Sequence, residues 1–232
     1  RGGGGLGGGL GPLKAVGPSS GLWGLPLQRL AASPHHSRLA RLCPAASVPD
    51  ALAAMVAALD ESLETPKLFR KPVSARALGG VKTYFNKNPR GGVPLGYDPH
   101  VVAASLVGLL ASLPEPLLTF DNYEAFLACL ALGDDHSMAL AAGPVEGAGE
   151  GGQGNTGADA FVTSNLAALL MTLPTAHKAT LCAVAPLLHR AVSPPAQVHN
   201  QCNPFVLGLV FGPALLRKPK PKGPDTNPNQ AF

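Results

Sequence analysis

Apolar residues recur at every third or fourth position over several long stretches of the chain, and this spacing is typical of helices that bury one face. The first such face consists of Leu52, Met55, Val56, Leu59 and Leu63. Comparable segments cover residues 75–87, 99–113, 121–132, 158–173, 175–192 and 204–216. No segment keeps the strict alternation of a half-buried strand. The pattern predicts an all-α domain of about seven to nine helices.

Three of these segments are preceded by residues that favour the start of a helix. Asp50, Ser74 and Asp98 each stand just before a predicted helix, where a side-chain oxygen can accept a backbone N–H of the first turn. Pro186 lies inside the segment 175–192 and predicts a kink or a break there. We therefore expect three capped helices and one interrupted helix.

The segment 204–216 is the longest apolar run, with 13 residues and an internal proline. A membrane-spanning helix needs about 20 apolar residues, so we predict no transmembrane segment. A helix that is apolar on all sides is typical of the interior of a domain. We therefore expect the last two helices, 175–192 and 204–216, to form the middle of the fold.

Glycine and proline divide the chain into one domain and three other segments. Residues 1–20 are a glycine-rich tail, residues 141–159 are a glycine-rich insertion, and residues 219–232 alternate proline with lysine and asparagine. Such segments lack the apolar area that offsets the entropy of ordering, so we predict that all three are disordered. The domain itself is predicted to cover residues 21–218.

The composition of the chain gives no indication of nucleic-acid binding, secretion or metal binding. The net charge of +4 is modest and gives no indication of nucleic-acid binding. The four cysteines form no CxxC pair, and the N-terminus lacks the order of a signal peptide, so we expect a cytoplasmic protein with reduced thiols. His199 and Cys202 would supply half of a metal site, but no second half follows. We predict no metal and no cofactor.

Basic residues crowd together between positions 63 and 86, although only 14% of the chain is charged: they are Lys67, Arg70, Lys71, Arg76 and Lys82. Arg70 directly follows an apolar Leu-Phe pair, and the prolines at 66 and 72 disfavour a continuous helix around it. We therefore expect an exposed loop in which Phe69 points inward and Arg70 points outward. The neighbouring lysines add positive potential that favours an acidic or phosphate-bearing surface.

Two further segments contain rigid corners. "SLPEPLLTFDNYEAF", residues 112–126, places two prolines around a glutamate directly after a helix, and "VFGPALLR", residues 210–217, places Gly-Pro in an apolar helix. We expect Leu113, Leu117 and Leu118 to be buried at the first corner. We also expect Glu115 to make a local hydrogen bond there.

These corners and the Arg70 segment resemble the Rho GTPase-activating (RhoGAP) domain family. The resemblance extends over about 190 residues in the same order. It is carried by "WGLPLQRL" (23–30), "VPDALAAMVAALDESLETPKLFRKPVS" (48–74), "HVVAASLVGLLASLPEPLL" (100–118), "LPTAHKATLCAVAPLLHRAV" (173–192) and "NQCNPFVLGLVFGPALLR" (200–217). One such segment alone would be weak evidence for the family, but five segments in the same order are specific evidence.

The resemblance implies that Arg70 stands at the arginine-finger position, which in this family is inserted into a small GTPase. The implied partner is a Rho/Rac-type GTPase in its GTP-bound state, whose contacts include Lys67 and Lys71. Recruitment to a membrane would come through that partner. The domain is then not an enzyme in its own right and at most stimulates the hydrolysis of GTP by its partner.

The sequence departs from the family pattern at four positions. Val107 and Val206 stand where active members usually have a lysine and an asparagine that hold the arginine loop and contact the GTPase. Ala111 replaces a frequent arginine, and Val73 replaces a glycine after the finger. These changes remove hydrogen bonds and make the surface apolar. The chain therefore resembles divergent members most closely.

Two readings of the resemblance stay open. The first is a domain that binds a Rho-family GTPase with weak activation through Arg70. The alternative is a catalytically dead adaptor that binds a GTPase or another protein. A third interpretation is an unrelated helical domain whose corners resemble the family by chance. The sequence offers no Ser/His/Asp or Cys/His arrangement that would indicate an enzyme acting on small molecules.

Overall fold

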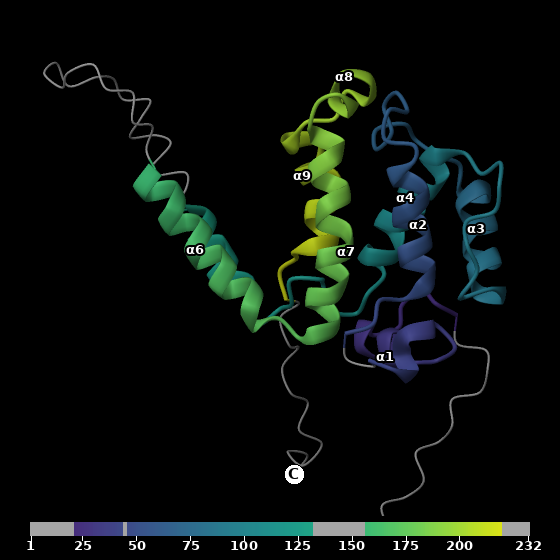
Figure 1. Cartoon of the computed structure of the whole chain (residues 1–232), viewed down its shortest axis with the longest axis horizontal. Coiled ribbons are helices and arrows are strands. Elements are labelled where there is room, and N and C mark those ends of the chain that lie inside the picture. The colour runs from purple at the N-terminus through teal and green to yellow at the C-terminus, as the bar shows by residue number, and fades with distance from the viewer. Residues whose placement is uncertain (1–20, 44–45, 132–155, 220–232) are drawn as a thin grey trace, which may run out of the picture.

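The computed structural model describes residues 21–43, 46–131 and 156–219, and this part of the chain contains helices and no strand (Figure 1). The helices are α1 (Leu27–Ala32), η1 (Arg38–Arg41, a 3-10 helix), α2 (Asp50–Asp60), α3 (Ala75–Lys87), α4 (Pro99–Ala111), α6 (Thr156–Thr172), α7 (Thr175–Val192), α8 (Ala196–Asn200) and α9 (Pro204–Leu215). A further helical segment covers residues 123–131. The predicted all-α fold class is confirmed. None of the helices described is both long and apolar enough to cross a bilayer.

The predicted disordered segments fall largely outside the described residues. Residues 1–20, 132–155 and 220–232 are not described. Residues 156–159, which the sequence pattern assigns to the glycine-rich insertion, instead form the first turn of α6. The predicted bounds of the domain, 21 and 218, stay a prediction.

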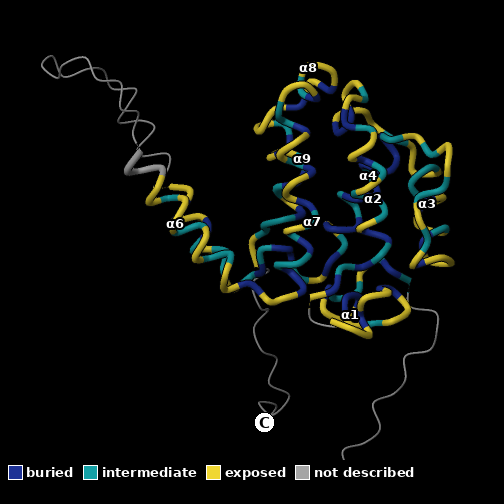
Figure 2. The backbone as a smooth tube through the Cα atoms, in the orientation of Figure 1, coloured by how far each residue is buried: buried dark blue, intermediate teal, exposed yellow. Residues whose placement is uncertain are grey.

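The helix α4 lies at the centre of the bundle, because it packs against α2, α3 and α9. Most of its residues are buried, and it includes small residues that allow close approach on several sides. The buried positions concentrate on the inner faces of α2, α4 and α7, whereas α6 extends away from the bundle and is largely exposed (Figures 1 and 2).

The expectation that 204–216 would be a central helix is wrong in part. Helix α9 buries Leu207, Phe211 and Ala214. Its other side is open to solvent, where Phe205 and Leu209 are 72% and 63% exposed. Although α9 has apolar residues on every side, the helix that it mainly packs against in the described part of the chain is α4.

Two of the three predicted caps are confirmed. Ser74 accepts the N–H of Ala77, and Asp98 accepts the N–H of His100. Asp50 does not cap α2, because it is the first residue of the helix, and its carboxylate pairs with Arg38 instead. The helix α7 continues through Pro186 without the break that we considered.

Two of the three leucines that we expected to be buried at the corner of residues 113–118 are buried, and the polar contacts of the corner differ from the expected ones. Leu113 and Leu117 are buried and Leu118 is half-buried. No hydrogen bond of Glu115 occurs among the residues that the structure describes, so that expectation is wrong. Instead, the N–H of Leu118 donates to the carbonyl of Leu215 at the end of α9, over 2.9 Å.

Arg217 makes the side-chain hydrogen bonds that the structure shows at this corner. Its guanidinium donates to the carbonyl of Ala111 (3.1 Å), to that of Leu113, and to that of Pro114 (3.1 Å). It also lies over the ring of Phe120, 5.8 Å from the centroid. A planar cation with several N–H donors suits three carbonyls at the end of a helix. Arg217 therefore joins the corner to the end of α9.

We expect Arg217→Ala to lower the free energy of unfolding by about 1–3 kcal/mol, because it leaves three carbonyls without their charged donor. Chemical denaturation monitored by circular dichroism measures this change. Lys218→Ala is the control, since Lys218 is an exposed cation next in the chain. Equal stability of the two variants would show that Arg217 does not support the corner.

We expect the thiols to separate into two reactivity classes in the native protein. Cys43 and Cys182 are exposed and should react quickly with a chromogenic disulfide reagent, whereas Cys129 and Cys202 are buried and should react only on unfolding. Titration with and without denaturant measures this difference. Rapid reaction of Cys202 in the native state would contradict the packing around it.

Candidate functional site

Arg70 lies in a tight turn between α2 and α3. The turn begins at Lys67, whose φ of 57° is left-handed. The backbone N–H groups of Arg70 and Lys71 both donate to the carbonyl of Lys67, over 2.9 and 3.1 Å. Pro66 and Pro72 stand just outside these bonds and lack an N–H that would continue a helix. The result is a compact loop with a defined tip.

Two apolar residues anchor the turn to the bundle. Phe69 is 8% exposed and meets Phe211 of α9 edge to face, with ring centroids 5.4 Å apart. Leu68 is fully buried, and its carbonyl accepts a hydrogen bond from Nδ1 of His100 over 3.3 Å. Phe69 thus points inward and Arg70 is exposed, as the sequence predicts. Within the described part of the chain, no carboxylate forms an ion pair with Arg70.

A buried amide holds the start of the turn. The side chain of Asn200 donates to the carbonyls of Leu63 and Ala191, each over 2.9 Å, and accepts the N–H of Cys202 over 2.7 Å. The backbone carbonyl of Asn200 accepts the N–H of Lys67 over 3.0 Å. One residue therefore connects the Arg70 turn with the end of α7 and the start of α9.

A pocket of about 250 Å³ opens beside the turn. It is lined by Leu68, Phe69, Lys71, His100, Ala103, Ala104, Val107, Gly108 and Val210. Apart from Lys71 and His100, none of these residues has a polar side-chain atom. Val107 therefore contributes an apolar wall on α4, and the exposed Lys71 provides a cation at the same pocket.

Val206 lies on α9 one turn before the pocket residue Val210, so the two share a face of that helix. Val206 is half-buried, and its N–H donates to the capping side chain of Asn203 over 2.8 Å. Val107 and Val206 thus stand on the two packed helices α4 and α9. The pocket beside Arg70 thus offers aliphatic walls and a cation, and the exposed side chain of Asn203 caps the helix next to Val206.

The thiol of Cys202 lies beneath the turn. Burial raises the pKa of the Cys202 thiol, whereas a hydrogen bond with the Phe69 backbone and the positive charge of Arg70 act in the opposite direction. Burial thus favours the neutral form of this thiol. His199 is exposed while Cys202 is buried, and no cluster of three metal-ligating side chains occurs in the described residues.

A larger cavity of about 710 Å³ lies between the end of α2 and the connection from α7 to α8. Its lining carries Asp60, Glu61 and Glu64, and Asp60 pairs with Arg190 over 2.7 Å. Carboxylates repel phosphate and acidic side chains. The smaller pocket beside Arg70 is therefore the better candidate for a phosphate-bearing partner.

The structure brings together most of the residues that the sequence singled out. Lys67, Arg70 and Lys71 share one turn, and Val107 lines the pocket next to it. Sequence reasoning missed the supports of the turn. Asn200 is the first residue of the segment 200–217 that resembles the family, but nothing in the local sequence pattern indicates that its side chain supports the turn. His100 has no such indication either, since its bond to the turn crosses 32 positions of the chain.

Several curated proteins are similar to the chain. Rho GTPase-activating protein 45 of Mus musculus is 34% identical over 125 residues, which are 53% of this chain and 11% of that protein. Bargin of Homo sapiens is 26% identical over 165 residues, which are 71% of this chain and 20% of that protein. The chain thus spans a fifth or less of the length of these relatives.

Solved structures share the fold. The crystal structure of human Rho GTPase activating protein 15 superposes with a TM-score of 0.63 at 19% sequence identity, covering 86% of this chain and 79% of that chain. The BH domain from Graf, the GTPase regulator associated with focal adhesion kinase, superposes with a TM-score of 0.56 at 16% identity, covering 74% and 80%. Similarity at these identities shows the fold alone.

A model of the RhoGAP domain matches residues 49–220. This range contains the Arg70 turn, its support Asn200 and the pocket at Val107. Because the match covers more than half of the chain and agrees with the shared fold, the chain belongs to the RhoGAP domain family.

Proposed function

We propose that this chain binds a Rho-family small GTPase in its GTP-bound state through the surface around Arg70, and that it accelerates GTP hydrolysis weakly. A RhoGAP domain regulates Rho GTPases and is not itself the catalyst. Beyond this general role of the family, we propose the binding surface, the role of Arg70 and the level of activity.

The observation that carries the proposal is the state of Arg70. Its backbone is fixed by the bonds to Lys67 and by the buried Phe69, yet its side chain is exposed. No carboxylate of the described residues neutralises it. A fixed loop with a free guanidinium is suited to insertion into a partner, whereas a structural arginine would be paired within its own chain.

The chemistry of GTP hydrolysis needs such a group. Negative charge develops on the γ-phosphoryl oxygens and on the bridging oxygen, and a guanidinium stabilises it. The planar cation can bond two oxygens at once and keeps its charge when water is excluded. A finger held in place contributes about 10³–10⁵ in rate in GTPase systems. Lys67 and Lys71 add positive potential around it.

The valines argue for weak activation. Val107 lines the pocket beside the turn, and Val206 stands on the same face of α9 as the pocket residue Val210. Neither side chain can donate a hydrogen bond to the GTPase. Misplacement of a catalytic group by about 1 Å can cost about 10² in rate. Aliphatic contacts support association, but they orient a guanidinium less strictly than hydrogen bonds do.

A second candidate function rests on the same two valines. The chain would then be an adaptor that binds a GTPase without changing its rate of hydrolysis. The neutral, buried thiol of Cys202 and the apolar pocket provide packing around the turn but no further polar group for catalysis. The two candidates differ only in the hydrolysis rate of the bound GTPase.

We expect the chain to bind at least one GTP-loaded Rho-family protein and to accelerate single-turnover hydrolysis by less than about 10³-fold, because the finger lacks polar support. Arg70→Ala should remove whatever acceleration exists. Arg76→Ala is the control, since Arg76 is an exposed arginine on the first turn of α3. A large acceleration that Arg70→Ala abolishes would overturn the weak-activator reading. Absence of binding to the whole Rho family would overturn the proposed partner.

We expect the double variant Val107→Lys with Val206→Asn to hydrolyse the GTP of the same partner at least about tenfold faster than the parent chain, because the new donors would hold the finger and the GTPase together. Single-turnover measurements at saturating domain separate this gain from a change in affinity. Leu209→Asn is the control, since Leu209 is an exposed position on α9. If the double variant gained nothing while keeping its fold, the valines would not be the cause of weak activity.

A further inference from the structure

The 3-10 helix η1 displays two different ridges to solvent. A 3-10 helix has three residues per turn, so side chains three positions apart eclipse one another. Arg38 and Arg41 form one ridge of η1, and Leu39 and the following Leu42 form the next. Ala40 occupies the third side and is 3% exposed, which places this side against the bundle. The leucines are 57% and 79% exposed.

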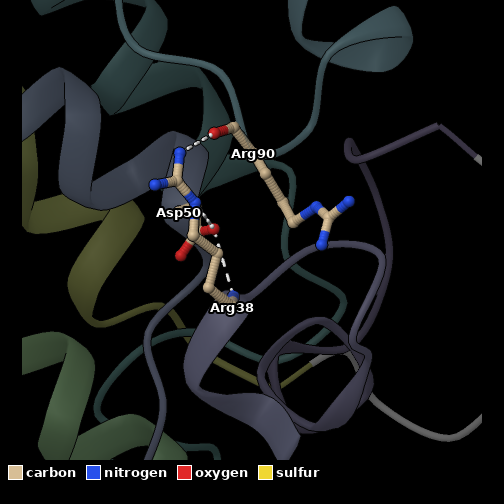
Figure 3. Close-up of polar contacts among 3 residues, drawn as sticks. All are labelled: Arg38, Asp50 and Arg90. Atoms are coloured by element: carbon tan, nitrogen blue, oxygen red, sulfur yellow. Dashed lines mark hydrogen bonds and ion pairs between the residues drawn. The ribbon is translucent and has the colours of Figure 1, made fainter.

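Ion pairing fixes the position of this helix. The Nε atom of Arg38 lies 3.3 Å from a carboxylate oxygen of Asp50, and the same oxygen accepts the backbone N–H of Arg38 over 3.1 Å. The Arg38 guanidinium also donates to the carbonyl of Arg90 over 2.6 Å. Figure 3 shows that the side chain of Arg90 itself extends away from Asp50. The contacts therefore join η1 to the segment after α3.

Most of the basic side chains around η1 are exposed, and only one of them forms an ion pair within the described part of the chain. Arg38 keeps 70% of its side chain exposed although it is paired. Arg41 and Arg90 are exposed, and neither has an ion pair within the described part of the chain. Asp50, the acidic partner of Arg38, is only 19% exposed at its side chain. The outward surface thus carries two arginines without an ion pair in the described residues, the paired Arg38 and two projecting leucines.

We propose that Arg38, Leu39, Arg41, Leu42 and Arg90, here called the Arg-Leu patch, bind directly to the surface of a bilayer that contains anionic lipids. Projecting leucines enter the boundary between headgroups and acyl chains, while the arginines remain with the phosphates. Each basic side chain near an anionic leaflet strengthens partitioning by about fivefold. Two leucines alone give marginal binding, so the charges are needed.

The shape of the patch favours a bilayer over a protein partner. Leu42 is 79% exposed and stands on a short turn, so the leucines project from the surface rather than line a groove. A specific protein partner buries about 800 Å² on each side and commonly encloses such side chains in a complementary pocket. A fluid bilayer needs no complementary shape. The basic charges supply the attraction that anionic headgroups require.

The patch lies far from the Arg70 turn along the bundle. The turn is bonded to Asn200 at the end of α8, and η1 packs against α1. Figure 1 shows α8 and α1 at opposite ends of the bundle. A bilayer at the Arg-Leu patch would therefore leave Arg70 free. The proposal does not depend on the proposed GTPase partner, since lipid binding is measured without any GTPase.

The test measures binding of the whole chain to phosphatidylcholine vesicles with and without about 30% phosphatidylserine, at low and high salt. We expect binding only to the mixed vesicles, with loss at high salt. Arg41→Glu combined with Arg90→Glu should weaken it at least about tenfold. Leu39→Ser combined with Leu42→Ser should weaken it by about tenfold through lost apolar burial. All four positions are exposed, so the fold should persist, and circular dichroism checks this.

Three controls separate the patch from other features of the chain. Arg76→Glu and Leu95→Ser change an exposed arginine and a fully exposed leucine elsewhere and should bind like the parent. Lys218→Glu combined with Lys220→Glu and Lys222→Glu tests the basic tail of the sequence. Binding lost only in the tail variant would overturn the proposal. So would equal binding to uncharged vesicles, no binding at all, or leucine variants that bind like the parent.

Discussion

The buried amide of Asn200 is the contact on which the candidate site depends. Its side chain pairs with Leu63, Ala191 and Cys202, and its backbone carbonyl holds the N–H of Lys67. A buried polar group left unpaired costs about 1–3 kcal/mol, so the chain must bring these segments together to satisfy it. The Arg70 turn is consequently tied to α7 and α8 at its base, while its tip stays in solvent.

The surface around Arg70 differs from its anchor in chemistry. Phe69 and Phe211 secure the turn from inside, whereas Val107 and Lys71 face the neighbouring pocket. In the proposed function, the fixed turn presents Arg70 to the partner and the aliphatic pocket limits the activation. The exposed side of α9, with Phe205 and Leu209, extends the apolar character of the molecule beyond this pocket. A partner would meet a surface that is cationic at one point and aliphatic beside it.

Helix type and the anchoring of the turn could be predicted from the sequence because both follow from local patterns. Ser74 and Asp98 cap their helices through bonds to residues two or three positions away. Phe69 and Arg70 have opposite polarity at neighbouring positions, and the prolines around them prevent a helix. The prediction failed for Asp50, because Arg38, which lies 12 positions away, competes for its carboxylate. It also missed the hydrogen bonds at the corner, because their donor, Arg217, lies more than 100 positions away in the chain.

The sequence by itself determined the all-α class, the RhoGAP family and the exposure of Arg70, since these depend on periodicity and on short segments in a fixed order. Only the tertiary structure decided which helix is central. Residues 204–216 are the most apolar run, yet α4 has neighbours on more sides than α9. It also decided that Asn200 and His100 support the turn and that Arg38 bonds both the Asp50 carboxylate and the Arg90 carbonyl. Hydropathy records the preference of each residue for burial, whereas burial itself depends on which distant segments pack against it.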